Sequence, residues 1–84
     1  MSKKKKLLAK LMEGNSDGNF PFQDLAVVIQ HVGYVYEGNT GSHRRFKLSG
    51  NPAINIQPRP DGKAKEYQIE QVREILKNLK GKKP

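Results

Sequence analysis

The spacing of apolar residues changes twice along this chain, and the changes limit the folds that it can adopt. Apolar side chains in residues 22–32 and 67–80 recur every three or four positions, as on one face of a helix. Residues 43–48 and 53–57 instead alternate between two faces, which is the period of a β-strand. The sequence therefore predicts two amphipathic helices, one before and one after a small sheet along the chain.

Turn-forming residues divide the stretch between these helices into short segments. Residues 34–36 are aromatic and β-branched, which favours a strand, and residues 38–41 after them are typical of a turn. Residues 49–52 form a second turn-like cluster. Pro58 and Pro60 end the last alternating segment, because proline has no N–H to donate to a ladder. We therefore expect three antiparallel strands in a meander.

Glycines and a short N-terminal pattern complete the expected order of elements. Apolar residues between positions 7 and 12 have helical spacing, so residues 4–13 are expected to form a short helix that ends at Gly14. Gly33 and Gly81 fit the position after the last turn of the two longer helices. The expected order is α-α-β-β-β-α, with no internal repeat.

The apolar faces of these elements predict an α+β domain with one covered sheet face. Phe46, Leu48, Ile54 and Ile56 share one face of the sheet, and the two long helices should pack on it side by side. The opposite face should stay in solvent and carry polar side chains, namely His43, Arg45, Lys47, Asn55 and Gln57.

The length and composition exclude several classes of protein. With 84 residues the chain has room for one small domain at residues 20–80, between a basic N-terminal tail with a helix and loop (1–19) and a basic C-terminal tail (81–84). The absence of cysteine excludes disulfide scaffolds and thiolate metal sites. No apolar run approaches the ~20 residues of a membrane span, and Lys10 interrupts the stretch that mimics a signal peptide. We expect a cytoplasmic protein that does not enter a membrane.

The distribution of charge favours an anionic partner. The chain has 16 basic and 8 acidic side chains, a net charge of +8. Lysines at both ends bind nucleic acid or only increase solubility. Residues 41–65 carry six basic side chains against Asp61 alone, and this segment lies inside the expected domain. Its charge is therefore the better indication of a partner.

His43 is the candidate for chemistry, because it lies beside Arg45 and Lys47 on the expected open face. An imidazole exchanges protons near neutral pH, and the preceding Gly41 lets a phosphate approach closely. The alternative is an ordinary surface histidine on a polar strand. His31 lies near the end of a helix, where a structural role is the better interpretation.

Other kinds of site are not supported by the sequence. A metal site is not expected, because a predicted turn separates His31 from His43 and no carboxylate cluster lies near either. Ser42 cannot act as a nucleophile with His43 as its base, because neighbours on a strand point to opposite faces. No cofactor motif is present. Tyr34 and Tyr36 can stack on nucleotide bases.

Five motifs follow one another along residues 20–80. They are Gly33-Tyr34, Gly41-Ser42-His43, Phe46-Lys47, the strand from Ile54 to Pro58, and Tyr67-Gln68-Ile69 at the start of the last helix. In this order they resemble the HicA family, small bacterial ribonucleases that act as toxins in type II toxin–antitoxin systems. The chain differs from many members at Thr40, where they have a basic residue, and at Arg59, where they have a histidine.

This resemblance implies a fold, an activity and a partner. The fold is like the double-stranded RNA-binding domain, with an α-β-β-β-α core. The activity is metal-independent cleavage of mRNA, with a catalytic histidine that corresponds to His43. The partner is a HicB-type antitoxin that inhibits the enzyme.

Together these observations suggest a mechanism in which neutral His43 removes the proton of a ribose 2′-hydroxyl and Arg45 and Lys47 stabilise the charge on the phosphoryl oxygens. The proton for the leaving oxygen can come from water, Lys47 or Tyr36. We expect further contacts to RNA from Ser42, Arg44, Arg59, Lys63 and Lys65. The alternatives are a non-catalytic RNA-binding module of the same fold and a basic protein-interaction domain.

Overall fold

The computed structural model describes residues 2–79 and shows a small α+β protein with the expected order of elements. Its three strands form one antiparallel sheet in the order β1-β2-β3. The elements are α1 (Lys3–Glu13), the 3-10 turn η1 (Asp17–Asn19), α2 (Phe22–His31), β1 (Val35–Thr40), β2 (His43–Lys47), β3 (Ile54–Ile56) and α3 (Glu66–Lys77).

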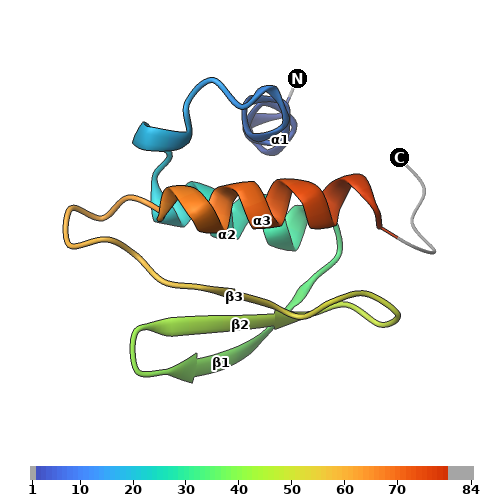
Figure 1. The fold of residues 1–84 in the computed structure, drawn as a ribbon. Coiled ribbons are helices and arrows are strands. Elements are labelled where there is room, and N and C mark those ends of the chain that lie inside the picture. Colours follow the sequence, from blue (N-terminus) through green and yellow to red (C-terminus); the bar gives the residue numbers. More distant parts are fainter. Residues whose placement is uncertain (1, 80–84) are drawn as a thin grey trace.

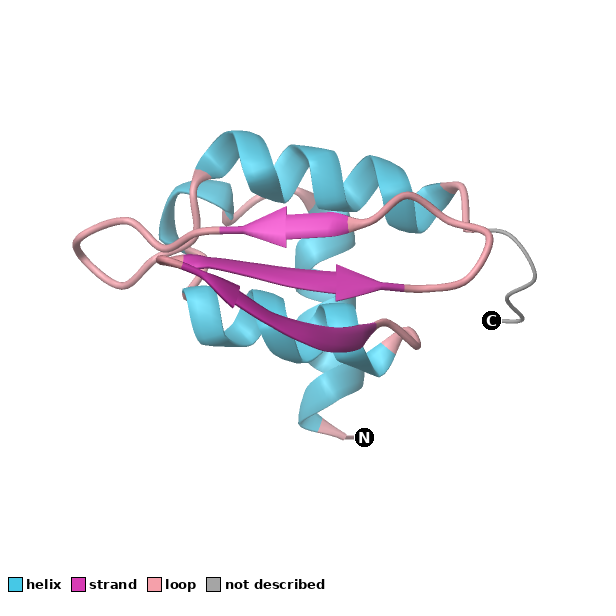
Figure 2. Cartoon of the chain, turned by 90° about the horizontal axis from the view of Figure 1, so that it is seen from below, coloured by secondary structure: helices cyan, strands magenta, loops and turns pink. Residues whose placement is uncertain are grey.

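The predicted core lies between the sheet and two helices. Figure 1 shows α2 and α3 side by side above the sheet, and Phe46, Ile54 and Ile56 of the strands are buried beneath them. Leu48 is half-buried and packs against the same cluster. The expectation that the apolar strand face is covered by these two helices is therefore confirmed. The opposite face of the sheet is open in Figure 2, where the strands lie in front of the helices.

Strand β1 is longer than its sequence suggested, because residues 38–40 pair with β2 instead of forming a turn. Gly38, Asn39 and Thr40 lie opposite Arg45, Arg44 and His43, so the prediction of a turn over 38–41 was wrong. The register shifts between Tyr36 and Gly38, and Gly38 has a φ of 117°, in the left-handed region that favours glycine. Residues prone to turns thus form a bulged strand, which leaves residues 41–42 as the turn.

Helix α1 forms a third layer on the side of α2 and α3 away from the sheet (Figure 1). Leu7 and Leu11 are buried there. Arg73 of α3 fixes the end of α1, because its Nε donates to the Leu11 carbonyl oxygen at 2.9 Å and its guanidinium forms an ion pair with Asp17. Residues 3–19 are therefore packed against the domain.

Helix α3 is shorter than the stretch 67–80 predicted from apolar spacing. It begins at Glu66 and ends at Lys77, where the Asn78 side chain donates to the Glu74 carbonyl oxygen at 2.8 Å and caps the last turn. Gly81, expected to close the helix, and the basic tail 81–84 lie outside the described residues. Across residues 2–79, none of the helices has the length and apolar character needed to cross a membrane.

Candidate functional site

The open face of the sheet carries the side chains that alternation along β2 assigned to it. His43, Arg45 and Lys47 are exposed, whereas Phe46 between them is fully buried. Arg44 points with Phe46 toward the helices, and its guanidinium carbon lies 4.9 Å from the centre of the Phe22 ring. The two arginines of β2 therefore serve different surfaces, in agreement with the sequence pattern.

His43 is the first residue of β2 and pairs with Thr40 of β1. Within residues 2–79 its imidazole has no hydrogen-bond or ion-pair partner, and it is exposed to solvent. An imidazole in this state can take a proton from a bound molecule. In the same part of the chain, no group of three His, Cys, Asp or Glu side chains could hold a metal ion.

Arg45 is the cation closest to His43 along the open face, but Glu37 partly offsets its charge. Its Nε lies 3.7 Å from Glu37 Oε1, and both side chains are almost half exposed. An exposed pair of this kind contributes little to stability and is easily exchanged for another partner. Arg45 can therefore turn to an incoming phosphate. Glu37 is the extra residue of the β1 bulge, between Tyr36 and Gly38. The bulge was not predicted from the sequence, so the contact of Glu37 with Arg45 was not predicted either.

Two of the three proton donors considered for the leaving oxygen lie away from His43 in the structure. Tyr36 packs on the covered side of the sheet, with its ring centre 5.6 Å from that of Phe46, and its hydroxyl donates to Asn39 Oδ1. Lys47 lies four residues from His43, about 13 Å along the strand. Water on the open face is the donor that remains.

The prediction that Tyr34 can stack on bases was wrong, because its ring is buried. Its hydroxyl donates to the Pro52 carbonyl oxygen at 2.8 Å, and burial raises the pKa of this group. Tyr34 thus joins the strand start to the loop before β3.

A chain of amide and ammonium hydrogen bonds lies beside the β1–β2 turn. Lys65 Nζ donates to Gln57 Oε1 at 2.8 Å, and Gln57 Nε2 donates to Ser42 Oγ at 2.9 Å. The Gln57 backbone N–H donates to Oε1 of the buried Gln68 at 2.9 Å. Lys65 at the start of α3 is thereby connected to the turn that precedes His43. Gln57 and Gln68 were not singled out as site residues, because their partners come from distant segments.

The remaining predicted RNA contacts lie in the loop after β3. Arg59 forms an ion pair with Asp61 and its Nη1 donates to the Gly18 carbonyl oxygen at 3.4 Å. The hydrogen bond from Arg59 lowers the pKa of Asp61 to about 2, with a further contribution from the Lys63 backbone N–H. Arg59 is therefore bound to other groups of the protein. Asp61 also offsets its charge, so the net positive charge of this loop is smaller than the number of its basic residues suggests.

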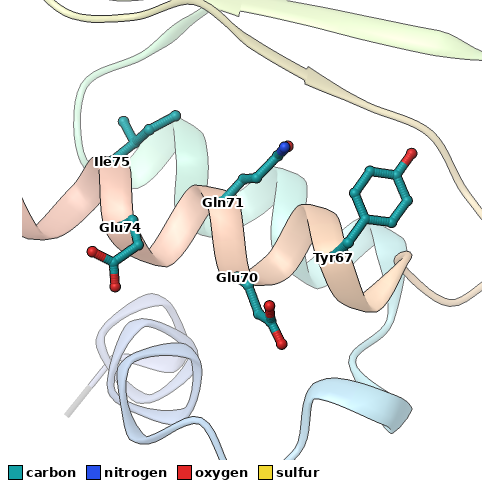
Figure 3. Close-up of a pocket in the computed structure, with 5 residues that line it drawn as sticks. All are labelled: Tyr67, Glu70, Gln71, Glu74 and Ile75. Carbon is teal, nitrogen blue, oxygen red and sulfur yellow. The ribbon is translucent and has the colours of Figure 1, made fainter.

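Among the hollows on the described surface, two differ in their chemistry. One, of ≈ 370 Å³, is lined by Ser42 and Arg44 together with Asn39 and the first residues of α2. The other, of ≈ 590 Å³, lies along α3 between Tyr67 and Ile75 and includes the carboxylates of Glu70 and Glu74 (Figure 3). Those carboxylates repel phosphate, so of these two hollows the smaller one is suited to an anion.

Comparisons with known proteins add no relative. No protein-family model matches the chain, and neither a curated protein nor a solved structure does. The function must therefore follow from the chemistry of the surface itself.

Proposed function

We propose that the chain is a metal-independent endoribonuclease, an mRNA-cleaving toxin of the HicA type, in which His43 is the general base. The observation that carries the proposal is the exposed His43 imidazole on an open sheet face, with Arg45 on the same face. A three-stranded antiparallel sheet covered on one side by two helices is compatible with the double-stranded RNA-binding-domain-like fold of such toxins.

The reaction that we propose needs no metal. Neutral His43 takes the proton of a ribose 2′-hydroxyl, and the oxygen attacks the adjacent phosphorus. The bond from phosphorus to the 5′-oxygen breaks, and this oxygen takes a proton from water. The products are a 2′,3′-cyclic phosphate and a free 5′-hydroxyl. Arg45 stabilises the negative charge that develops on the phosphoryl oxygens.

A non-catalytic RNA-binding module is the second candidate, and one observation favours it. Catalytic bases are usually oriented by a third group. Within the described part of the chain, the His43 imidazole has no such partner. In this alternative His43 is one more contact to the RNA backbone.

Cleavage of a labelled single-stranded RNA by the purified protein separates the two candidates. His43→Ala is expected to slow cleavage by about 10²–10⁴, the usual contribution of a general base. His31→Ala is the matched control, because it removes the other, equally exposed histidine on α2 and should leave the rate unchanged. EDTA should have no effect, and a 2′-deoxy residue at the cleavage site should block the reaction. Equal cleavage by wild type and His43→Ala would exclude His43 as the base, and tight binding without cleavage would favour the binding module.

We further propose that a cytoplasmic HicB-type antitoxin with an acidic surface covers the open face. Arg45 and Lys47 are exposed there, and complementary charge mainly accelerates association. The association rate with such an antitoxin should therefore fall steeply as salt increases from low to physiological concentration. Stopped-flow measurement across a salt series tests this, and a rate independent of salt contradicts it.

A further inference from the structure

The hollow of ≈ 370 Å³ beside the β1–β2 turn contains a cation without a counter-ion. Arg44 is half-buried, and its guanidinium is stacked over the buried Phe22 ring at 4.9 Å. Within residues 2–79 Arg44 has no ion-pair partner, and none of the described residues that line the hollow is acidic. A guanidinium has only donors to offer. The hollow therefore presents fixed positive charge to solvent.

Two more residues that line the hollow, Ser42 and Asn39, have donors that no hydrogen bond within residues 2–79 uses. Lys65 donates to Gln57 Oε1, which leaves Gln57 Nε2 to donate to Ser42 Oγ. Ser42 is therefore an acceptor in this contact, and its own hydroxyl proton can be donated to another group. Asn39 Oδ1 likewise accepts from the Tyr36 hydroxyl, and within residues 2–79 the Asn39 amide N–H groups donate to no other group.

A group that only accepts hydrogen bonds fits these donors. A phosphate has acceptor oxygens and negative charge, and it forms its strongest hydrogen bonds with guanidinium groups. We propose that the hollow binds one phosphate group through Arg44, Ser42 and Asn39. Resting on the proposed function, we assign to it the backbone phosphate next to the one that is cleaved.

The position of the hollow relative to His43 supports this assignment. Ser42 and His43 are consecutive, so their Cα atoms are about 3.8 Å apart. Ser42 lines the hollow, whereas His43 is exposed on the open face. A strand that passes over the turn can therefore place one phosphate in the hollow and the next at His43, which would hold the scissile bond near the base.

Binding can be tested without any catalysis, with inorganic phosphate as the probe and chloride at equal ionic strength as the control. In ¹⁵N spectra, phosphate should shift the amide signals of Ser42 and Arg44. Arg44→Ala should weaken binding by about 10- to 100-fold, the usual effect of losing a charge-assisted hydrogen bond. Lys77→Ala is the matched control, because it removes one exposed cation at the end of α3, outside the proposed site, and should leave the affinity within twofold. Equal losses in the two variants, or shifts confined to the open face, would overturn the proposal.

Two further variants keep the test informative if Arg44→Ala does not fold. Arg44→Lys retains the charge and the stem over Phe22 but lacks the planar fork, and Ser42→Ala removes one donor. Both should fold and bind phosphate several-fold more weakly than wild type. Unchanged affinity in both would overturn the proposal.

A second arm distinguishes an RNA phosphate from free phosphate. With His43→Ala protein, a single-stranded RNA should shift the same two amides as inorganic phosphate does. For the active enzyme, an extra terminal phosphate on a dinucleotide substrate should lower KM at nearly constant kcat, and Arg44→Ala should abolish this gain. His43-dependent cleavage without any effect at the hollow would overturn this inference alone. Phosphate binding in the hollow without cleavage would instead overturn the proposed function.

Discussion

At the scale of single residues, Arg59 and Asp61 determine how much charge the loop after β3 presents. Arg59 donates from Nε to Asp61 Oδ1 at 3.1 Å, and this contact is the main reason why the pKa of Asp61 is lowered to about 2 from 3.8. The pKa of Arg59 is raised by the same hydrogen bond. Asp61 thus remains ionised at any pH at which RNA is handled, and it competes with phosphate for Arg59.

Removal of Arg59 should therefore return Asp61 to an ordinary titration. In Arg59→Ala, the midpoint of the Asp61 carboxyl signal in an NMR titration should rise from about 2 toward 3.8. The pKa of Asp61 is lower in the folded protein than in the unfolded chain. The Arg59–Asp61 pair therefore stabilises the protein at pH values above the unfolded-state pKa, and this contribution is lost as the pH falls toward 2. Lys63→Ala is the control, since it keeps the backbone N–H that donates to Asp61. A wild-type midpoint near 3.8 would contradict the pairing.

Side-chain contacts at the site were predictable where they depend on one strand, and were not predictable where they join distant segments. Alternation along β2 is a local property, and it correctly separated Arg45 from Arg44. The Ser42–Gln57 hydrogen bond joins positions 15 apart, and it depends on where the loop after β3 returns. Arg59 was expected to contact RNA, and its ion pair with Asp61 was not predicted, because that pair depends on loop conformation. Function itself, including the role of His43, remains a proposal.

At the scale of elements, the attachment of α1 depends on one side chain of α3. Only about 14% of the Arg73 side chain is exposed, and it satisfies both a helix-end carbonyl at Leu11 and the carboxylate of Asp17. Gly14 ends α1 with a φ of 78° and lies against the guanidinium, which is 3.5 Å from the position of an added Cβ. A side chain at position 14 would be strained by this backbone conformation, whereas its Cβ would make only an ordinary van der Waals contact with Arg73.

Arg73→Ala should accordingly destabilise the protein by about 1–3 kcal/mol, because it leaves a buried acceptor and a carboxylate without partners. Lys77→Ala is a matched control on the same helix. It removes an exposed ion pair with Glu74 and should cost less than about 0.5 kcal/mol. Urea unfolding followed by circular dichroism measures both. Equal effects of the two changes would show that Arg73 does not hold α1.

Helices were easier to predict than strands for a physical reason. An apolar stripe reports burial along one face, and the stripes of α2 and α3 correctly identified the layer that covers the sheet. The extent of β1 depends on pairing with β2, and a partner strand can hold turn-prone residues such as Gly38 in a bulge. The place of α1 was not predictable, because the stripe that buries Leu11 does not specify which neighbour it contacts.

At the scale of the whole molecule, two groups of exposed basic side chains lie on opposite sides. Lys3 to Lys6 are exposed on α1, and α2 and α3 separate this helix from the sheet (Figure 1). Arg45 and Lys47 are exposed on the open face below. Of these two groups, an RNA strand that lies across the open face therefore neutralises the second and not the first. The total charge of the protein then overstates the number of phosphates that it contacts.

This separation makes a quantitative prediction for RNA affinity in the cleavage-deficient His43→Ala background. The logarithm of the association constant falls with the logarithm of salt concentration, with a slope of about −0.7 per phosphate neutralised on a single strand. Arg45→Ala and Lys47→Ala should each reduce the magnitude of the slope by about 0.7. Lys4→Ala removes the same charge from α1 on the far side and should leave the slope unchanged. Fluorescence anisotropy across a salt series measures all three. If Lys4→Ala reduced the slope as much as Arg45→Ala, the RNA would have to contact α1 as well, and the open face would not be its only binding surface.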